Sequence, residues 1–194
     1  MSLDHILLGM LRSPSTGYEL GNEFSRSAQH FWFAERSQIY PTLKRLRNRG
    51  LLTGWEEPSE RGPRRKVYQT TPEGRRELRK WLLEGPQIGH ERLAHIAQTF
   101  FLGELDDFAE SLRIVGKMRA KWASKLAYLE FTEATVKDEG GEWLQLDMDD
   151  FHRYAALRMG LHMLRAKIVW CDETADHLQQ RLGQSERKLV GKEG

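Results

Sequence analysis

The chain has 194 residues, of which 39% are hydrophobic and 30% are charged, and its net charge is +2. This length favours two unequal parts, a small module plus an extension, over two full-sized domains. The single Cys171 excludes an intramolecular disulfide framework, and no run approaches the roughly 18 apolar residues that a membrane span needs. Because the N-terminus lacks a basic region and a long apolar region, we expect no signal peptide, a cytoplasmic protein and no membrane partner.

The charge is distributed unevenly along the chain. Residues 1–90 carry 15 Lys and Arg against 10 Asp and Glu, whereas residues 91–194 carry 15 against 18. Residues 36–80 carry 13 against 5, a local excess of +8. Such an excess is typical of a phosphate-binding surface, although a solvated basic face would also produce it.

Helical signals dominate the first 50 residues. Apolar residues recur at helical spacing over 3–12 and predict a first helix there. Thr16 and Glu19 have the spacing of a capping box, which predicts a second helix that reaches about Ser27.

A third helix is predicted to begin at Ser37, which can cap it, and to end at Gly50. Pro41 costs this helix at most one early backbone hydrogen bond, because it lies only four residues after Ser37. The buried stripe of the helix follows the helical period and consists of Ile39, Leu43 and Leu46.

Two strands and a fourth helix follow. Residues 51–57 and 65–70 are predicted strands, joined by a turn at 61–64. Thr71 and Pro72 then begin a helix, with Pro at the first helical position. The order helix, helix, helix, strand, strand, helix predicts a winged helix-turn-helix DNA-binding domain over residues 1–86.

The second part of the chain is predicted to be entirely helical. Two Gly and one Pro over residues 84–89 mark the boundary between the two parts. The fold class is therefore mainly α, a winged helix-turn-helix domain followed by an all-helical, coiled-coil-like dimerisation domain over 90–183. The predicted segments are helices over 91–102, 106–139 and 148–183 and a flexible tail over 184–194.

The last predicted helix carries a long apolar seam with the 3-4 spacing of a coiled coil, and such a seam needs a partner helix. The partner is either the helix over 106–139 of the same chain or a second copy, and both contacts can coexist in a dimer. We expect the seam to be shared with a second chain. The residues expected at this dimer contact are Leu157, Leu161, Leu164, Ile168, Cys171 and Leu178.

The sequence offers no specific catalytic or metal-binding arrangement. His90 and His95 are five residues apart, whereas two zinc ligands on one helical face must be four apart. Paired acids such as Asp149 and Asp150 precede a predicted helix, where capping explains them. We therefore expect no enzyme, no metal and no cofactor.

The third helix and the hairpin after it together predict a DNA-binding surface. Gln can pair with adenine and Thr can contact a thymine methyl group, whereas Lys and Arg hold the phosphate backbone. Tyr68 is either a contact or a packing residue. The expected DNA contacts are Gln38, Tyr40, Pro41, Thr42, Lys44, Arg45 and Arg47 on the helix and Arg61, Arg64, Arg65 and Lys66 on the hairpin.

Several separated motifs within residues 1–90 occur in the order typical of one known family. They are Gly17-Tyr18-Glu19-Leu20, Phe31-Trp32, residues 37–46, Gly50-Leu51, and Tyr68 with Thr71 and Gly74. These motifs resemble the PadR family of bacterial transcriptional regulators, and the remainder resembles its larger subgroup with a three-helix C-terminal domain. The resemblance implies a homodimer bound to a palindromic double-stranded DNA operator, usually a repressor released by a small aromatic or amphipathic effector. It also implies that Tyr18, Ser37, Gln38, Tyr40 and Lys44 face DNA.

A pocket for a phenolic acid-like effector needs an apolar slot and a cation or hydrogen-bond donor for the carboxylate. Trp122 and Trp170 suit such a slot but suit a helix core equally well. The candidates between the two long helices are Arg119, Trp122, His152, Arg153, Tyr154, Arg158 and Trp170.

Other functions are compatible with the same fold. A transcriptional activator, or a regulator that responds to drugs or other ligands, would share every motif described above. A protein-interaction adaptor that docks through its winged helix would not need the local charge of +8, and an enzyme would have to turn over its ligand.

Overall fold

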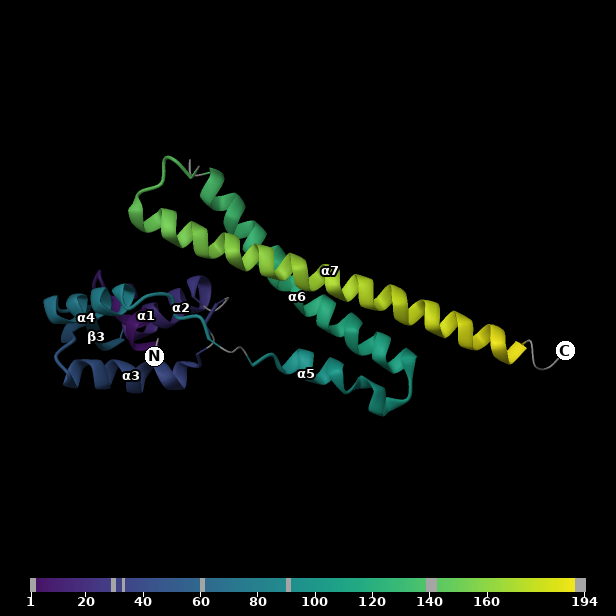
Figure 1. Cartoon of the computed structure of the whole chain (residues 1–194). Coiled ribbons are helices and arrows are strands. Elements are labelled where there is room, and N and C mark those ends of the chain that lie inside the picture. Colours follow the sequence, from purple (N-terminus) through teal and green to yellow (C-terminus); the bar gives the residue numbers. More distant parts are fainter. Residues whose placement is uncertain are drawn as a thin grey trace. The chain divides into compact units, whose positions relative to one another are not determined.

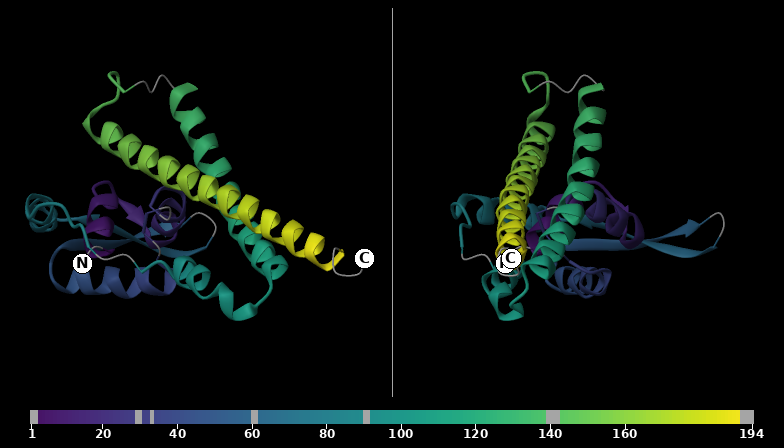
Figure 2. Two further views of the ribbon diagram at one scale, coloured as in Figure 1. Left: turned by 45° about the vertical axis from the view of Figure 1, so that its right-hand side comes forward. Right: turned by 90° about the vertical axis from the view of Figure 1, so that its right-hand side faces the viewer.

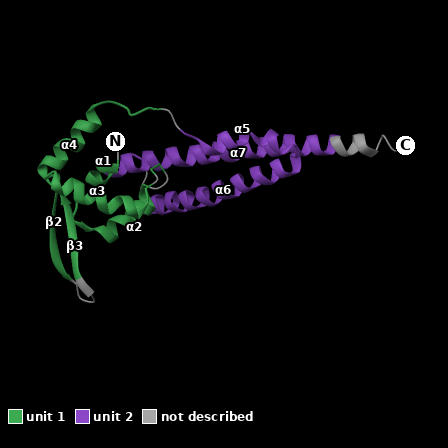
Figure 3. Cartoon of the chain, turned by 90° about the horizontal axis from the view of Figure 1, so that it is seen from below, with its two compact units in different colours: residues 1–90 green, residues 91–194 purple. Residues whose placement is uncertain are grey.

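The computed structural model describes residues 3–28, 31–32, 34–59, 62–89, 92–138 and 143–190 (Figure 1). The chain forms two compact units, unit 1 over residues 1–90 and unit 2 over residues 91–194 (Figure 3). Among the described residues, no helix is long and apolar enough to cross a membrane.

Unit 1 is a winged helix-turn-helix domain, as the sequence predicts. Its described helices are α1 (Leu3–Met10), α2 (Gly17–Ser27), α3 (Arg36–Asn48) and α4 (Pro72–Leu83). Its strands are β1 (Ser15–Thr16), β2 (Leu52–Ser59) and β3 (Gly62–Thr70), antiparallel in the order β1-β3-β2. The two-residue β1 was not predicted, because so short a strand shows no periodicity. Strands β2 and β3 form the wing, which projects from the helices of this unit (Figure 2, right).

The core of unit 1 is closed by residues distant in sequence. The predicted stripe of α3 is confirmed, since Ile39, Leu43 and Leu46 are at most 2% exposed. They pack with Leu20 and Phe24 of α2, which are at most 1% exposed. Burial of apolar surface therefore fixes α3 against α2 and leaves its opposite face in solvent.

Glycine permits close packing where α4 meets β2. A Cβ on Gly74 would overlap the carbonyl oxygen of Leu51 and lie 2.8 Å from a methyl carbon of Thr70. Thr71 caps α4 by accepting from the amide of Gly74 at 3.1 Å, and its hydroxyl donates to the Gly50 carbonyl at 2.8 Å. These contacts fix the end of β3 and the start of α4.

The predicted capping box of α2 is confirmed, and the cap of α3 is corrected. The amide of Glu19 donates to Thr16 Oγ1 at 3.2 Å, and the amide of Thr16 donates to Glu19 Oε2 at 2.9 Å. The amide and the hydroxyl of Thr16 both donate to the Glu19 carboxylate, and these two hydrogen bonds lower the pKa of Glu19. At α3 the cap is Glu35 instead of Ser37, because Gln38 accepts from the Glu35 amide at 3.0 Å and begins the helix earlier.

Unit 2 is an antiparallel helical hairpin with a short helix before it. The short helix α5 (Ala94–Phe100) and the 3-10 turn η1 (Leu102–Leu105) precede α6 (Phe108–Asp138) and α7 (Met148–Val190). Helix α7 continues seven residues beyond the predicted end at 183, because a single Gly183 does not stop a helix whose following residues favour it. Residues 184–190 are therefore helical instead of a flexible tail.

The apolar seam of α7 packs on α6 of the same chain, which is one of the two partners that the sequence left open; a contact with a second chain stays a prediction. Leu157, Leu161 and Leu164 are at most 9% exposed and cluster with Leu129 of α6. Cys171 is buried, with its sulfur 3.7 Å from the carbonyl oxygen of Val115. Two helices joined by a short connection have a high effective concentration for each other, so the intramolecular contact forms readily. Toward the end of the seam, Ile168 and Leu178 are partly buried.

Candidate nucleic-acid interface

The exposed face of α3 presents three rows of side chains, because residues seven apart lie almost above each other on a helix. The contacts of Tyr40 with α2 and of Arg45 with α1 orient these rows. The rows are Ser37 with Lys44 in the centre, Tyr40 with Arg47 toward α2, and Gln38 with Arg45 toward α1, and all six side chains are exposed.

Tyr40 is supported by a glycine of α2. A Cβ on Gly17 would lie 2.7 Å from the Tyr40 ring, so the absence of a side chain there lets the ring lie against α2. Tyr40 remains 51% exposed and Tyr18 64% exposed. The guanidinium of Arg36 lies 5.6 Å from the centre of the Tyr18 ring and donates to Asn22 Oδ1 at 2.6 Å. Two exposed tyrosines are thus held on one surface.

Arg36 belongs to this surface although the sequence patterns did not identify it. It occupies the first position of α3, one residue before the predicted cap, so it was assigned to the preceding loop. Arg36 follows the exposed Tyr18 by 18 residues, and no helical or strand periodicity in the sequence links the two. Only the packing of α2 against α3 brings it to the Tyr18 ring.

The wing carries exposed cations whose partners lie on the neighbouring strand. Arg64 Nε lies 3.6 Å from Glu56, and Arg65 Nη2 lies 3.7 Å from Glu57. Lys66 lies 5.9 Å from the centre of the Tyr68 ring. Tyr68 itself is 9% exposed, and burial raises the pKa of its phenol, so packing is its role.

Thr42 and Arg45 differ from the sequence expectation. Thr42 is 4% exposed and lies on the buried side of α3, beside Leu43, so it is removed from the set of base contacts. Arg45 is exposed but forms an ion pair with Asp4 of α1. Within the described part of the chain, Lys44 and Arg47 form no ion pair. Arg61 lies outside the described residues, and Pro41 is exposed on α3.

The residues expected to form an effector pocket lie in two separate places. The first surrounds Glu133 of α6, which is 7% exposed. Tyr154 donates to its carboxylate at 3.1 Å and Arg158 at 2.6 Å, and the hydrogen bond from Arg158 lowers the pKa of Glu133 against the effect of burial. The Trp143 ring packs edge-on at 4.8 Å from Tyr154.

The second place lies 16 residues farther along α7, a separation of about 24 Å at 1.5 Å per residue. Here the rings of Trp122 and Trp170 lie 6.2 Å apart, and His95 of α5 meets Trp122 edge-on at 5.0 Å. Lys167 lies 5.7 Å from the centre of the Trp122 ring. Burial, and secondarily Lys167, lowers the pKa of His95.

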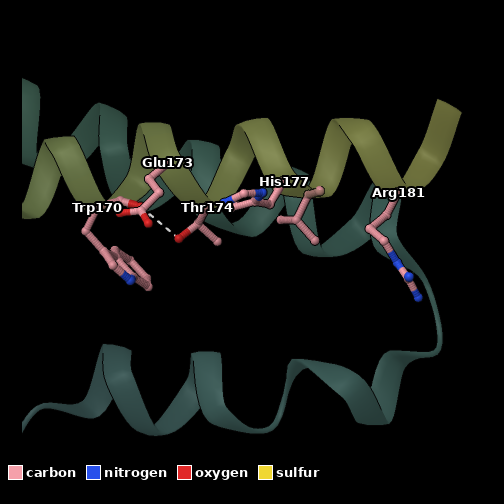
Figure 4. Close-up of a pocket in the computed structure, with 6 residues that line it drawn as sticks. Trp170, Glu173, Thr174, His177 and Arg181 are labelled. Carbon is pink, nitrogen blue, oxygen red and sulfur yellow. Dashed lines mark hydrogen bonds between the residues drawn. The ribbon is translucent and has the colours of Figure 1, made fainter. Parts of the chain in front are cut away.

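A groove of about 270 Å³ begins at Trp170 and follows one face of α7 (Figure 4). The hydroxyl of Thr174 donates to the Trp170 backbone carbonyl one turn before it at 2.7 Å, so this hydroxyl is already engaged within the helix. The groove is lined by Trp170, Glu173, Thr174, His177, Leu178 and Arg181.

Each of the remaining effector candidates is held by another contact and lies in neither of these two places. Arg153 pairs with Asp150 at 3.5 Å, and Arg119 pairs with Asp172 on the exposed surface of the hairpin. His152 Nδ1 lies 2.7 Å from the backbone oxygen one turn before it. Among the described residues, no group of three or more His, Cys, Asp or Glu is arranged to hold a metal ion.

Two family descriptions match the chain. "Transcriptional regulator PadR-like family" matches residues 6–80, and "Virulence activator alpha C-term" matches residues 96–189. The chain is 30% identical over 192 residues to the "Probable transcriptional regulator Rv1176c" of Mycobacterium tuberculosis, covering 93% of this chain and 100% of that protein. It is 26% identical to the "Negative transcriptional regulator PadR" of Bacillus subtilis, covering 88% and 93%.

Solved structures show the same fold. Bacillus subtilis PadR in complex with operator DNA matches with a TM-score of 0.78 and 24% identity over 92% of this chain and 99% of that chain. The Vibrio cholerae virulence activator AphA matches with a TM-score of 0.72 and 25% identity over 93% and 99%. With the winged helix, the helical second unit and a relative matched over its full length, the chain belongs to the PadR-like family of transcriptional regulators.

Proposed function

We propose that the protein is a homodimeric repressor that binds a palindromic DNA operator, with α3 in the major groove and the β2–β3 wing on the phosphates. One observation carries the proposal: the face of α3 opposite its buried stripe is exposed, and its central row holds Ser37 and Lys44. Such a face fits the major groove, where side chains reach base edges. Because chromosomal DNA is the target, we place the protein in the cytoplasm.

The relatives support this role. One Bacillus subtilis relative is a negative regulator, and a structural neighbour was solved with operator DNA. Another neighbour is a virulence activator, so the same fold serves both directions of control. We favour repression because the curated relative whose printed name gives a direction of control is a negative regulator. A promoter-reporter assay with and without the protein decides whether the protein represses or activates transcription.

Footprinting on the DNA upstream of the protein's own gene and its neighbours tests operator binding. If each subunit makes four to six phosphate contacts, the logarithmic salt slope of a dimer is about −7 to −11. Tyr40→Ala is expected to lower operator affinity far more than affinity for other DNA. Arg64→Ala is expected to weaken binding to all sequences and to flatten the slope by about 1 per subunit. Absence of any salt-sensitive, sequence-selective binding would refute the proposal.

We further propose that a small aromatic acid releases the protein from DNA by binding at the Trp170 groove. A structural neighbour was solved with p-coumaric acid, which makes this compound the natural probe. The groove combines an aromatic wall, Trp170, with a cation, Arg181, at its other end. A second cation, Lys167, lies over the ring of Trp122, which is in edge-on contact with Trp170. An aromatic ring and a carboxylate need these two kinds of partner.

Titration of p-coumarate, followed by tryptophan fluorescence and by release from the footprinted operator, tests this placement. Trp170→Leu is expected to weaken binding about tenfold, as loss of an aromatic contact of 1–1.5 kcal/mol implies. Tyr154→Phe in the Glu133 cluster is the matched control and should bind normally. Normal binding by Trp170→Leu together with weakened binding by Tyr154→Phe would place the effector at the Glu133 cluster. No change in the fluorescence or the operator binding of the wild-type protein would exclude this compound class.

A further inference from the structure

Asp4, in the first turn of α1, lies between two arginines of the DNA-facing unit. One carboxylate oxygen accepts from Arg45, and the other lies 3.4 Å from Nη1 of Arg49. Arg49 also lies 3.4 Å from Glu77 of α4. The Asp4 side chain is 16% exposed, whereas Arg45 is 54% exposed. The carboxylate is therefore held in place by packing, while the guanidinium remains open to other anions.

The wing repeats this arrangement with different residues. Glu56 and Glu57 on β2 face Arg64 and Arg65 on β3 at 3.6 and 3.7 Å. A carboxylate presents two oxygens to a guanidinium much as a phosphate does. Both elements proposed to meet DNA thus hold arginines beside an internal substitute for phosphate.

Among the described residues, the cations of the central and α2-facing rows of α3 lack a neighbouring carboxylate. Lys44 and Arg47 have no such carboxylate within the described part of the chain. Arg45 belongs to the row toward α1, away from the central row of Ser37 and Lys44. The carboxylates therefore restrain cations at the flanks of the surface and leave its centre free.

We propose that Asp4, supported by Glu56 and Glu57, determines selectivity for the operator by competing with DNA phosphates for flanking arginines. This inference rests on the proposed DNA-binding function. Sequence-independent complexes depend on phosphate contacts alone and have no fixed register, so they recruit every available cation. Operator binding also uses base contacts from the central row. Restraining Arg45 and Arg49 therefore weakens sequence-independent binding more than operator binding.

Asp4→Asn tests the proposal, with binding measured across a salt series to the footprinted operator and to a duplex of scrambled sequence. Releasing one or two cations should steepen the salt slope on the scrambled duplex by about 1–2 per subunit and tighten its binding about 3–10-fold. Operator affinity should change less, so the selectivity ratio falls. Glu73→Gln is the matched control, because it removes the same charge from an ion pair with Arg76 on α4.

A double-mutant cycle separates competition from a structural role of Asp4. In an Arg45→Gln, Arg49→Gln background, Asp4→Asn should no longer change the slope. If Asp4→Asn impairs folding, Glu57→Gln in the wing provides the same test with a smaller expected gain. An unchanged slope in both variants, or an equal change in Glu73→Gln, overturns the inference. If the wild-type protein itself binds neither duplex, the proposed function fails instead.

Discussion

The two units bury their apolar side chains to very different extents. In unit 1, Leu20 and Leu43 come from separate helices and are completely buried. In unit 2, the described helix α5 buries no side chain, and its last residue, Phe100, and the following Phe101 are 82% and 62% exposed. An exposed apolar patch of this kind marks an interaction surface. Each described helix of unit 1 buries at least one residue, although Leu82 and Leu83 at the end of α4 are 63% and 82% exposed. Helix α5 of unit 2 buries none, and this remaining apolar surface supports the proposed homodimer.

Leu164→Asp is expected to produce the largest effect, because it places a carboxylate in the interior of the α6–α7 hairpin. Leu164 is 9% exposed and packs with Leu129. Burying an unpaired charge there should cost about 3–5 kcal/mol and unfold unit 2 instead of yielding a folded monomer. Circular dichroism and sedimentation measure helix content and mass together.

The matched control for this variant is Met159→Asp, at a side chain of α7 that is 61% exposed. It should leave helix content unchanged. A folded monomer with Leu164→Asp would show that the seam is shared between chains after all.

Gly74→Ala tests whether unit 1 is the tightly packed unit. The added Cβ overlaps the Leu51 carbonyl oxygen, and backbone at that point has little room to move. Overpacking of this kind should destabilise unit 1 by about 2–3 kcal/mol in urea unfolding. Gly116→Ala on α6 meets nothing within 4 Å and should stabilise unit 2 by about 0.5–1 kcal/mol. Equal changes in the free energy of unfolding for Gly74→Ala and Gly116→Ala would show that the two units are packed equally tightly.

Glu133→Gln probes the buried polar contact of unit 2. Gln keeps a hydrogen-bond acceptor for Tyr154 but loses the charge that pairs with Arg158, so a loss of about 1–2 kcal/mol is expected at neutral pH. The folded pKa of Glu133 lies below its ordinary value, so its contribution is present above the unfolded pKa of 4.5 and disappears as pH falls through the folded pKa. The variant and wild type should therefore converge in acid, and a pH-independent difference would contradict this.

Local patterns predicted the elements of unit 1 well. Thr16 with Glu19, Thr71 with Pro72, and the stripe of Ile39 and Leu43 each depend on neighbours within a few residues, and each occurs as predicted. The N-cap of α3 is Glu35 and not the predicted Ser37, because Glu35 and Gln38 form a capping box. Ser37 was the predicted cap because N-cap propensity ranks Ser above Glu.

Contacts between distant segments were not predictable in the same way. The heptad pattern of α7 specifies an apolar partner but not which chain supplies it, so α6 was not distinguished from a second copy. Asp4 and Arg45 are 41 residues apart, and no spacing rule joins them. The effector candidates share a composition suited to aromatic acids, yet their positions along α7 place Tyr154 and Trp170 in different clusters.

The smallest expected effect separates the two sides of α3 within unit 1. Thr42 is 4% exposed, so Thr42→Val should leave operator affinity unchanged and alter the free energy of unfolding by only about 1 kcal/mol. Lys44→Gln should do the reverse, weakening DNA binding several-fold with about 0.5 kcal/mol or less of change in stability, because its side chain is exposed in the central row. Fluorescence anisotropy with the footprinted operator and urea unfolding measure both quantities. If Thr42→Val lost sequence selectivity, α3 would have to rotate about its axis to expose Thr42, and burial of Leu43 and Leu46 opposes that rotation.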